Sequence, residues 1–142
     1  MQSPTAIEAP RIFPAMRFRN AAKMIDWLCE AFGFTVHAKY MDGDTVAHAQ
    51  LAFGSSMIMC GDMRDNAYGD LVGAPDGAGG KSLYIAVDDV DALCERAARA
   101  GAEIVEGPVE RDYGSREIIC RDPEGNIWSF GTYWPKAHEP AE

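Results

Sequence analysis

The chain has 142 residues, 47% of them hydrophobic, so a single domain can bury a core without disulfides or metals. Its 22 carboxylates outnumber its 13 lysines and arginines, and the net charge of −9 opposes binding to nucleic acids and anionic membranes. No apolar run approaches the length of a membrane span, and residues 1–10 lack the pattern of a signal peptide. We predict one domain over residues 1–142, with neither nucleic acid nor membrane as a partner.

The first half of the chain predicts one helix among four strands. Asn20 can cap a helix in which apolar residues recur at helical spacing up to Phe32, and Gly33 ends this pattern. An Asp42-Gly43 pair predicts a hairpin turn. The strands are predicted at residues 12–19, 35–40, 45–53 and 57–60. The predicted order is β-α-β-β-β.

The second half repeats this order. Asp88 or Asp89 can cap a helix that ends at Gly101. The strands are predicted at residues 83–87, 104–105, 117–121 and 127–133. The chain therefore contains two modules, at about 11–61 and about 82–134. Residues 62–81 between them are rich in Gly, Ala, Asp and Pro, which predicts an irregular linker that can act as a flap over a cavity.

The stretch from Arg121 to Phe130 is the most informative motif. Pro123 presets the backbone for an Asp-Pro-Glu-Gly turn, Gly125 can adopt the positive φ that such a turn needs, and an apolar strand follows. With the repeated order of elements, this turn resembles the vicinal oxygen chelate superfamily of glyoxalases, bleomycin resistance proteins and dioxygenases. The resemblance covers nearly the whole chain. It implies an α+β fold in which tandem βαβββ modules form a cupped mixed sheet with helices on its outer face.

The resemblance also assigns a side to each strand residue, because side chains alternate along a strand. The cup side receives Phe13, Ala15, Arg17, Met59, Ser82, Tyr84, Ile127 and Ser129. The helix side receives Met16, Phe18, Trp128 and Phe130. This assignment places the largest apolar rings in the core.

Enzymes of the superfamily hold a divalent ion with His, Gln and Glu side chains from four strands. By resemblance, the corresponding positions here are Phe13, Met59, Ser82 and Ser129. None of them carries the imidazole or carboxylate that Zn, Ni, Mn or Fe(II) prefers. We therefore expect no metal, no cofactor and no catalytic residue of the family type.

Two polar residues of the third predicted strand are candidates for contact with a ligand. His48 alternates with Val46 and Gln50, which predicts that the three side chains share the cup face. A strand histidine is either a hydrogen-bonded structural residue or, beside Gln50, a group that orients a ligand or acts as a general base. We favour contact with a ligand over catalysis.

The other candidates for ligand binding are Arg17, Arg116, Tyr84, Met59 and Ser129. Each arginine can bind a ligand carboxylate or phosphate through its planar guanidinium, or can instead pair with a carboxylate of the chain itself. Tyr84 and Met59 would form part of an apolar wall. The acidic balance of the chain suits a cationic ligand.

The four cysteines show no Cys-x-x-Cys spacing, so we predict buried free thiols and a cytoplasmic location. The function predicted from these features is metal-independent binding of a small organic molecule in an apolar cup, by a protein that the resemblance implies is a homodimer. The alternative is an enzyme, namely a glyoxalase-like lyase, isomerase or dioxygenase with a displaced metal site, or one with acid–base chemistry at His48. An oligomeric structural module with a filled cup is a third possibility.

Overall fold

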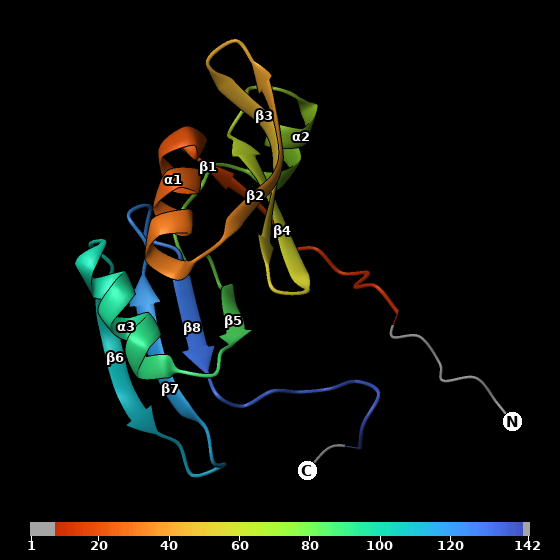
Figure 1. Ribbon diagram of the computed structural model, residues 1–142. Helices are drawn as coiled ribbons and strands as arrows, with labels where there is room; N and C mark the ends of the chain where they lie inside the picture. The colour runs from red at the N-terminus through yellow and green to blue at the C-terminus, as the bar shows by residue number, and fades with distance from the viewer. Residues whose placement is uncertain (1–7, 141–142) are drawn as a thin grey trace, which may run out of the picture.

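The computed structural model describes residues 8–140 (Figure 1). Within this range the chain forms eight strands and three helices. In chain order they are β1 (Ala15–Phe18), α1 (Ala21–Phe32), β2 (Thr35–Asp42), β3 (Thr45–Phe53), β4 (Ser56–Asp62), α2 (Ala67–Val72), β5 (Ser82–Ala86), α3 (Val90–Arg99), β6 (Glu103–Glu110), β7 (Arg116–Arg121) and β8 (Ile127–Gly131). The order β-α-β-β-β occurs twice, as the sequence predicts, and α2 lies between the two occurrences.

The strands form two four-stranded sheets rather than one continuous sheet. The first sheet has the order β1-β4-β3-β2 and the second has the order β5-β8-β7-β6. In each sheet the first and last strands of the module pair in parallel, and the other pairs are antiparallel. Helices α1 and α3 lie side by side and pack against their own sheets (Figure 1). The expected α+β fold is therefore present, and one face of each sheet is left uncovered by these helices.

The core lies between these helices and the sheets, and the two modules share it. The rings of Phe18, Trp128 and Phe130 are fully buried, which confirms their predicted orientation. Phe32, at the end of α1, reaches into the second module, where its ring centroid lies 4.7 Å from that of Phe130 and 5.2 Å from that of Trp128. Burial of one such ring stabilises a fold by about 1.5–3 kcal/mol, so these contacts couple the modules.

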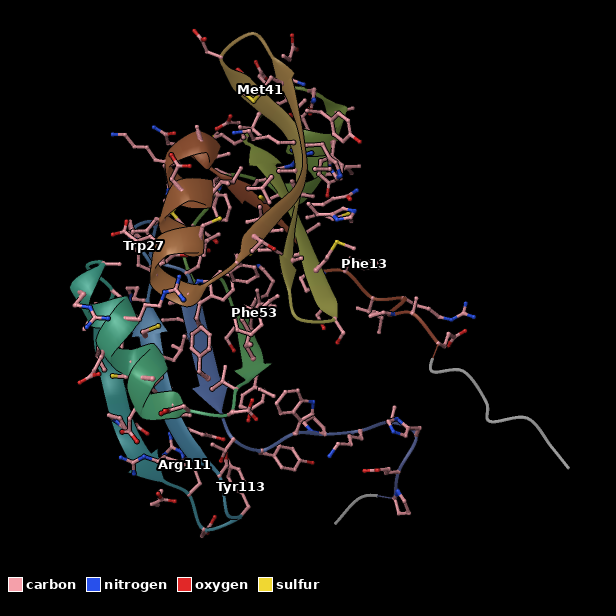
Figure 2. All side chains as sticks on the ribbon, viewed as in Figure 1. Phe13, Trp27, Met41, Phe53, Arg111 and Tyr113 are labelled. Carbon is pink, nitrogen blue, oxygen red and sulfur yellow. The ribbon has the colours of Figure 1, made fainter. Side chains whose placement is uncertain are left out.

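Helices α1 and α3 also satisfy each other's terminal carbonyl groups. The last carbonyls of a helix have no partner within the helix. The indole Nε1 of Trp27 in α1 donates to the carbonyl of Ala100 after α3 (2.7 Å). In return, Nε of Arg96 in α3 donates to the carbonyl of Glu30 in α1 (2.7 Å). Trp27 lies near the place where the two helices meet (Figure 2).

Several elements differ from those predicted, most of all β6, which covers Glu103–Glu110 where only residues 104–105 were predicted. The first strand begins at Ala15 because Pro14 has no N–H to donate to a ladder. The last strand ends at Gly131, two residues earlier than expected. The linker is not wholly irregular, because α2 forms within it, where the side chain of Asn66 accepts the amide N–H of Gly69 (2.8 Å). A helix of six residues with no buried side chain carries too weak a pattern to be found by apolar periodicity.

The four cysteines are free, as predicted. Cys60 and Cys120 are buried in β4 and β7, whereas Cys29 and Cys94 are half-buried in the two long helices. Burial raises the pKa of Cys60 and that of Cys120 to about 12. Among residues 8–140 no helix is both long enough and apolar enough to cross a membrane.

Candidate functional site

A β-bulge in β3 determines which side chains reach the uncovered face of the first sheet. Tyr40 of β2 pairs with His48, but the next residue, Met41, pairs with Val46, so Ala47 has no partner. The extra residue interrupts the alternation of side chains. Val46 is therefore fully buried on the helix side, and the prediction that it shares a face with His48 is wrong.

Six side chains of the first sheet define what we call the reader face. It lies opposite the buried residues Ala49, Leu51 and Ile58. It consists of Arg17, Tyr40, His48, Gln50, Met57 and Met59. Four of them, Arg17, His48, Gln50 and Met59, are candidates named from the sequence, and the structure brings them together on three neighbouring strands.

The polar groups at the centre of the reader face contact each other. Nε2 of Gln50 lies 3.2 Å from Nε2 of His48. The ring of Tyr40 stacks on the His48 ring, with 6.1 Å between the two ring centroids. Beside them, Gln50 pairs with Met59, which in turn pairs with Ala15 of β1. A histidine and an amide thus lie next to a flexible thioether, a combination that can contact both polar and apolar parts of a ligand.

Arg17 occupies the β1 edge of the reader face, next to the linker. It is opposite Gly61 in the β1–β4 pair, and a Cβ atom on Gly61 would lie 2.7 Å from the Arg17 guanidinium. The guanidinium carbon lies 4.7 Å from the ring centroid of Tyr68 in α2. Figure 1 shows α2 on the side of the first sheet opposite α1. The linker thus covers this edge, as expected of a flap.

The uncovered face of the second sheet contains Tyr84, Ile119, Ile127 and Ser129, together with a carboxylate that sequence reasoning missed. Tyr84 pairs with Ser129, and Glu117 is on the same face as Ile119. Glu117 is only 7% exposed. Tyr113 Oη donates to it at 2.6 Å and Arg111 Nε at 3.2 Å. The alternation of β7 could have placed Glu117 there, because Ile119 pairs with Ser129.

The surroundings of Glu117 determine its charge state. Burial alone would raise the pKa of its carboxyl group, but hydrogen bonds from Tyr113, Ser115 and Arg111 outweigh burial and hold it below the ordinary value. The hydrogen bond that Tyr113 donates to Glu117 also raises the pKa of the Tyr113 hydroxyl group. Tyr84 Oη donates to the carbonyl of Tyr133 (2.6 Å). Arg111 and Tyr113 lie close together at the lower end of this module (Figure 2). The polar groups of this face are therefore engaged with one another.

Arg116 does not join these groups. Its Nη2 and Nη1 atoms form ion pairs with Asp91 of α3 (2.8 Å) and Glu110 of β6 (3.0 Å). A contact with α3 places the side chain on the helix side of the second sheet. For this candidate, the structure therefore favours pairing with the chain's own carboxylates over binding of a ligand.

The positions that correspond to the family's metal ligands do not fit a metal ion. Phe13 precedes β1, where the N-terminal segment meets β4 (Figure 2). Met59, Ser82 and Ser129 lie on strands, where Ser82 pairs with Ile127. Two hydroxyls, a thioether and a phenyl ring are a poor donor set for a divalent ion. No group of three or more His, Cys, Asp or Glu side chains in residues 8–140 is arranged to hold one.

An apolar cavity of about 360 Å³ lies between the two modules. The tip of the β3–β4 hairpin, strand β5 and the C-terminal segment contribute to its wall. Its apolar lining includes Phe53, Met57, Leu83, Tyr84 and Trp134. Trp134 is half exposed, so the cavity is open on one side. Figure 2 shows Phe53 near the boundary between the modules.

A sequence model of the glyoxalase/bleomycin resistance protein/dioxygenase superfamily matches residues 13–130, a range that spans both modules. The chain belongs to this superfamily. The resemblance inferred from the turn and the repeat is therefore confirmed. The match identifies the fold, whereas what the protein binds or does depends on the side chains of its two uncovered faces.

Several individual proteins resemble the chain over most of its length. An uncharacterized protein of Mycobacterium bovis, Mb0911c, is 30% identical over 125 residues, which cover 86% of this chain and 82% of the relative. The crystal structure of TioX from Micromonospora sp. ML1 has a TM-score of 0.70 and 26% identity, covering 86% of this chain and 94% of TioX. TnmS3, an antibiotic binding protein from Streptomyces sp. CB03234, has a TM-score of 0.64 and 21% identity, covering 87% and 97%.

Proposed function

We propose that the protein binds a small organic molecule on its reader face, without a metal ion and as a homodimer. The observation that carries this proposal is the combination of His48, Gln50, Arg17 and two methionines, all half-buried, on one sheet face. Membership of the glyoxalase/bleomycin resistance superfamily and the similarity to an antibiotic binding protein support it. Small-molecule sites are mostly apolar with a few placed polar groups, and the reader face has this composition.

A homodimer is supported by the apolar surface that a single chain leaves open. Ile12 is 87% exposed and Trp134 is 50% exposed, and the cavity between the modules lies close to both. A second copy placed there would cover these side chains and would close the open side of the cavity. Contiguous exposed apolar surface of this kind is typical of protein–protein contacts.

Metal independence is supported by the donor set at the family positions. Only side chains such as imidazole, thiolate or carboxylate bind Zn, Ni, Mn or Fe(II) tightly, and Met59, Ser82 and Ser129 are none of these. We therefore expect substoichiometric metal after purification without chelator and after reconstitution. Four free thiols also suit a reducing cytoplasm.

The test is a binding screen of planar organic compounds, monitored by thermal shift and confirmed by calorimetry. We expect hits that bind wild type and His138→Ala equally, because His138 lies in the exposed C-terminal segment. The double variant His48→Ala/Gln50→Ala should bind them about 10-fold more weakly or worse, as removal of two polar contacts implies. Sedimentation of the same samples should show a dimer.

Two results would overturn the proposal. Absence of any compound that binds the folded protein would show that the reader face is not a ligand site. A stoichiometric divalent ion together with turnover that collapses in His48→Ala would instead establish the enzyme alternative.

A further inference from the structure

The chain has 22 carboxylates, yet Arg17 forms no ion pair with any of them in residues 8–140. Its one hydrogen bond is long, from Nη1 to the backbone carbonyl of Asp62 (3.4 Å). The side chain is half-buried on the reader face. A partly desolvated guanidinium with so few acceptors has unused N–H groups, and these are suited to a planar oxyanion.

The side chain of Asp62, whose backbone carbonyl Arg17 contacts, is prevented from serving as an ion-pair partner. Oδ1 of Asp62 accepts the amide of Ala21 (2.8 Å), and its Oδ2 accepts the amide of Val46 (2.7 Å). These bonds hold the start of α1 and the bulge of β3 in place. Both carboxylate oxygens therefore face the backbone, and only the carbonyl of Asp62 reaches Arg17.

Two features hold Arg17 in a position from which it can receive a ligand. Gly61 has no Cβ atom, and a Cβ atom at this position would lie only 2.7 Å from Nη1 of the Arg17 guanidinium. Tyr68 contacts the guanidinium through its ring at 4.7 Å. A ring in a cation–π contact attracts the guanidinium without accepting its N–H groups as a carboxylate would, so these groups stay available for an anion.

Arg17 lines two cavities, both of which it shares with Tyr68. One has a volume of about 270 Å³ and lies under the linker, and the other, of about 360 Å³, continues along β1. Their walls consist mainly of the linker, from Met63 to Gly77. Cavities of about 300 Å³ and more are of the size that holds a small organic ligand.

We propose that the ligand is an organic acid, with its carboxylate bound by Arg17 and its apolar part seated between the linker and the reader face. This inference rests on the proposed function and specifies its ligand class. It reverses the expectation of a cationic ligand drawn from the net charge. The cavity walls carry charges of both signs, with Arg17, Arg64 and Lys81 beside Asp65, Asp70 and Asp76, so the net charge of the chain does not describe the site. Charges farther away are screened beyond about 8 Å at physiological ionic strength. Tyr68 acts as a positioning residue for the guanidinium.

The experiment uses three probes with the same ring system, 2-naphthoate, 2-naphthamide and 2-naphthylmethylammonium. Each is titrated by calorimetry into the full chain at 0.15 M salt. We expect 2-naphthoate to bind at least about 10-fold more tightly than the other two, as a charge-assisted bidentate contact implies. Arg17→Gln should remove this preference, and Arg17→Lys should restore part of it. Arg99→Gln removes an exposed arginine of α3 and should change nothing.

The role of Tyr68 is tested in the same way. Tyr68→Phe keeps the ring and should retain the affinity for 2-naphthoate. Tyr68→Ala should weaken 2-naphthoate several-fold and leave 2-naphthamide unchanged, because only the acid depends on the orientation of Arg17. Equal losses for the acid and the amide would show that Tyr68 merely packs against the ring.

Failure of this inference is distinguishable from failure of the proposed function. If the amide or the amine binds as tightly as the acid, or if Arg17→Gln leaves the acid unaffected, the ligand class is wrong while ligand binding stands. The same conclusion follows if none of the three probes binds but other compounds from the screen do. If no compound binds at all, both proposals are overturned.

Discussion

The two modules have the same order of elements and the same strand pairing, but their uncovered faces differ in how the polar groups are engaged. On the reader face, within residues 8–140, Arg17 has a single long hydrogen bond, and His48 has Gln50 as its hydrogen-bond partner and Tyr40 as its stacked neighbour. On the second face Glu117 accepts bonds from Tyr113 and Arg111. In a protein with a repeated fold, one module can therefore bind a ligand while the polar groups of the other module stabilise the structure. This is possible because function depends on the side chains rather than on the fold.

The largest effect should come from the core that both modules share. Trp128→Ala removes a fully buried ring that packs against Phe32 of the first module. We expect the free energy of unfolding to fall by about 3–5 kcal/mol, as for other buried aromatic residues replaced by alanine. Ser129→Ala is the matched control, since this neighbour points to the uncovered face, and its change should stay within about 0.5 kcal/mol. Equal losses in the two variants, measured by urea unfolding, would contradict the assignment of sides.

The second effect compares two aspartates, the buried Asp122 of the second module and the half-buried Asp62 of the first. Asp122 accepts the amides of Glu124 and Asn126 and the indole Nε1 of Trp128, at 2.9–3.0 Å. Asp62 accepts only two amides. Each orphaned buried donor costs about 1–3 kcal/mol, so Asp122→Ala should destabilise the protein by about 3 kcal/mol or more and Asp62→Ala by about 2 kcal/mol. The reverse order in urea unfolding would show that the bonds at the β3 bulge dominate.

Some local features of the fold could be predicted from the sequence. The Asp-Pro-Glu-Gly turn and the helix caps at Asn20 and Asp89 follow from local rules, and the structure confirms them. Local rules suffice there because each signal involves residues adjacent in the chain.

The candidate site depends on contacts that are distant in the chain. The bulge at Ala47 involves Asp62, sixteen residues from Val46, so alternation alone misplaces Val46. The different fates of Arg17 and Arg116 depend on which carboxylates the fold brings near them, and no spacing in the sequence encodes this. Four of the seven residues predicted to contact a ligand are therefore on one face, while the other three lie on the second sheet.

A smaller effect should come from Glu117 of the second face, whose contribution to the stability of the fold depends on pH. The folded-state pKa of Glu117 is below its ordinary value of 4.5, so its stabilising contribution is present above that value and is lost as the pH falls through the folded pKa. Glu117→Gln should cost about 1–2 kcal/mol at pH 7, and its deficit relative to wild type should shrink as the pH falls below the ordinary carboxyl pKa of 4.5. Glu95→Gln, on the exposed side of α3, should follow the wild-type curve. A deficit for Glu117→Gln that does not change between pH 7 and pH 3 would show that the carboxylate charge is not what stabilises the fold.

The smallest difference between the modules should be in their thiols. Each module has one half-buried helix cysteine and one buried strand cysteine, Cys29 and Cys60 in the first and Cys94 and Cys120 in the second. Burial raises the pKa of Cys60 and that of Cys120 to about 12, so at pH 8 almost no thiolate forms at either site. In the native protein, Ellman's reagent should therefore react slowly with Cys29 and Cys94 at similar rates and spare the other two, whereas all four should react in urea. The double variant Cys29→Ser/Cys94→Ser should show almost no native reaction. Fast reaction of Cys60 alone would mean that the first module opens locally while the second stays closed, so the modules would differ in their dynamics as well as in their faces.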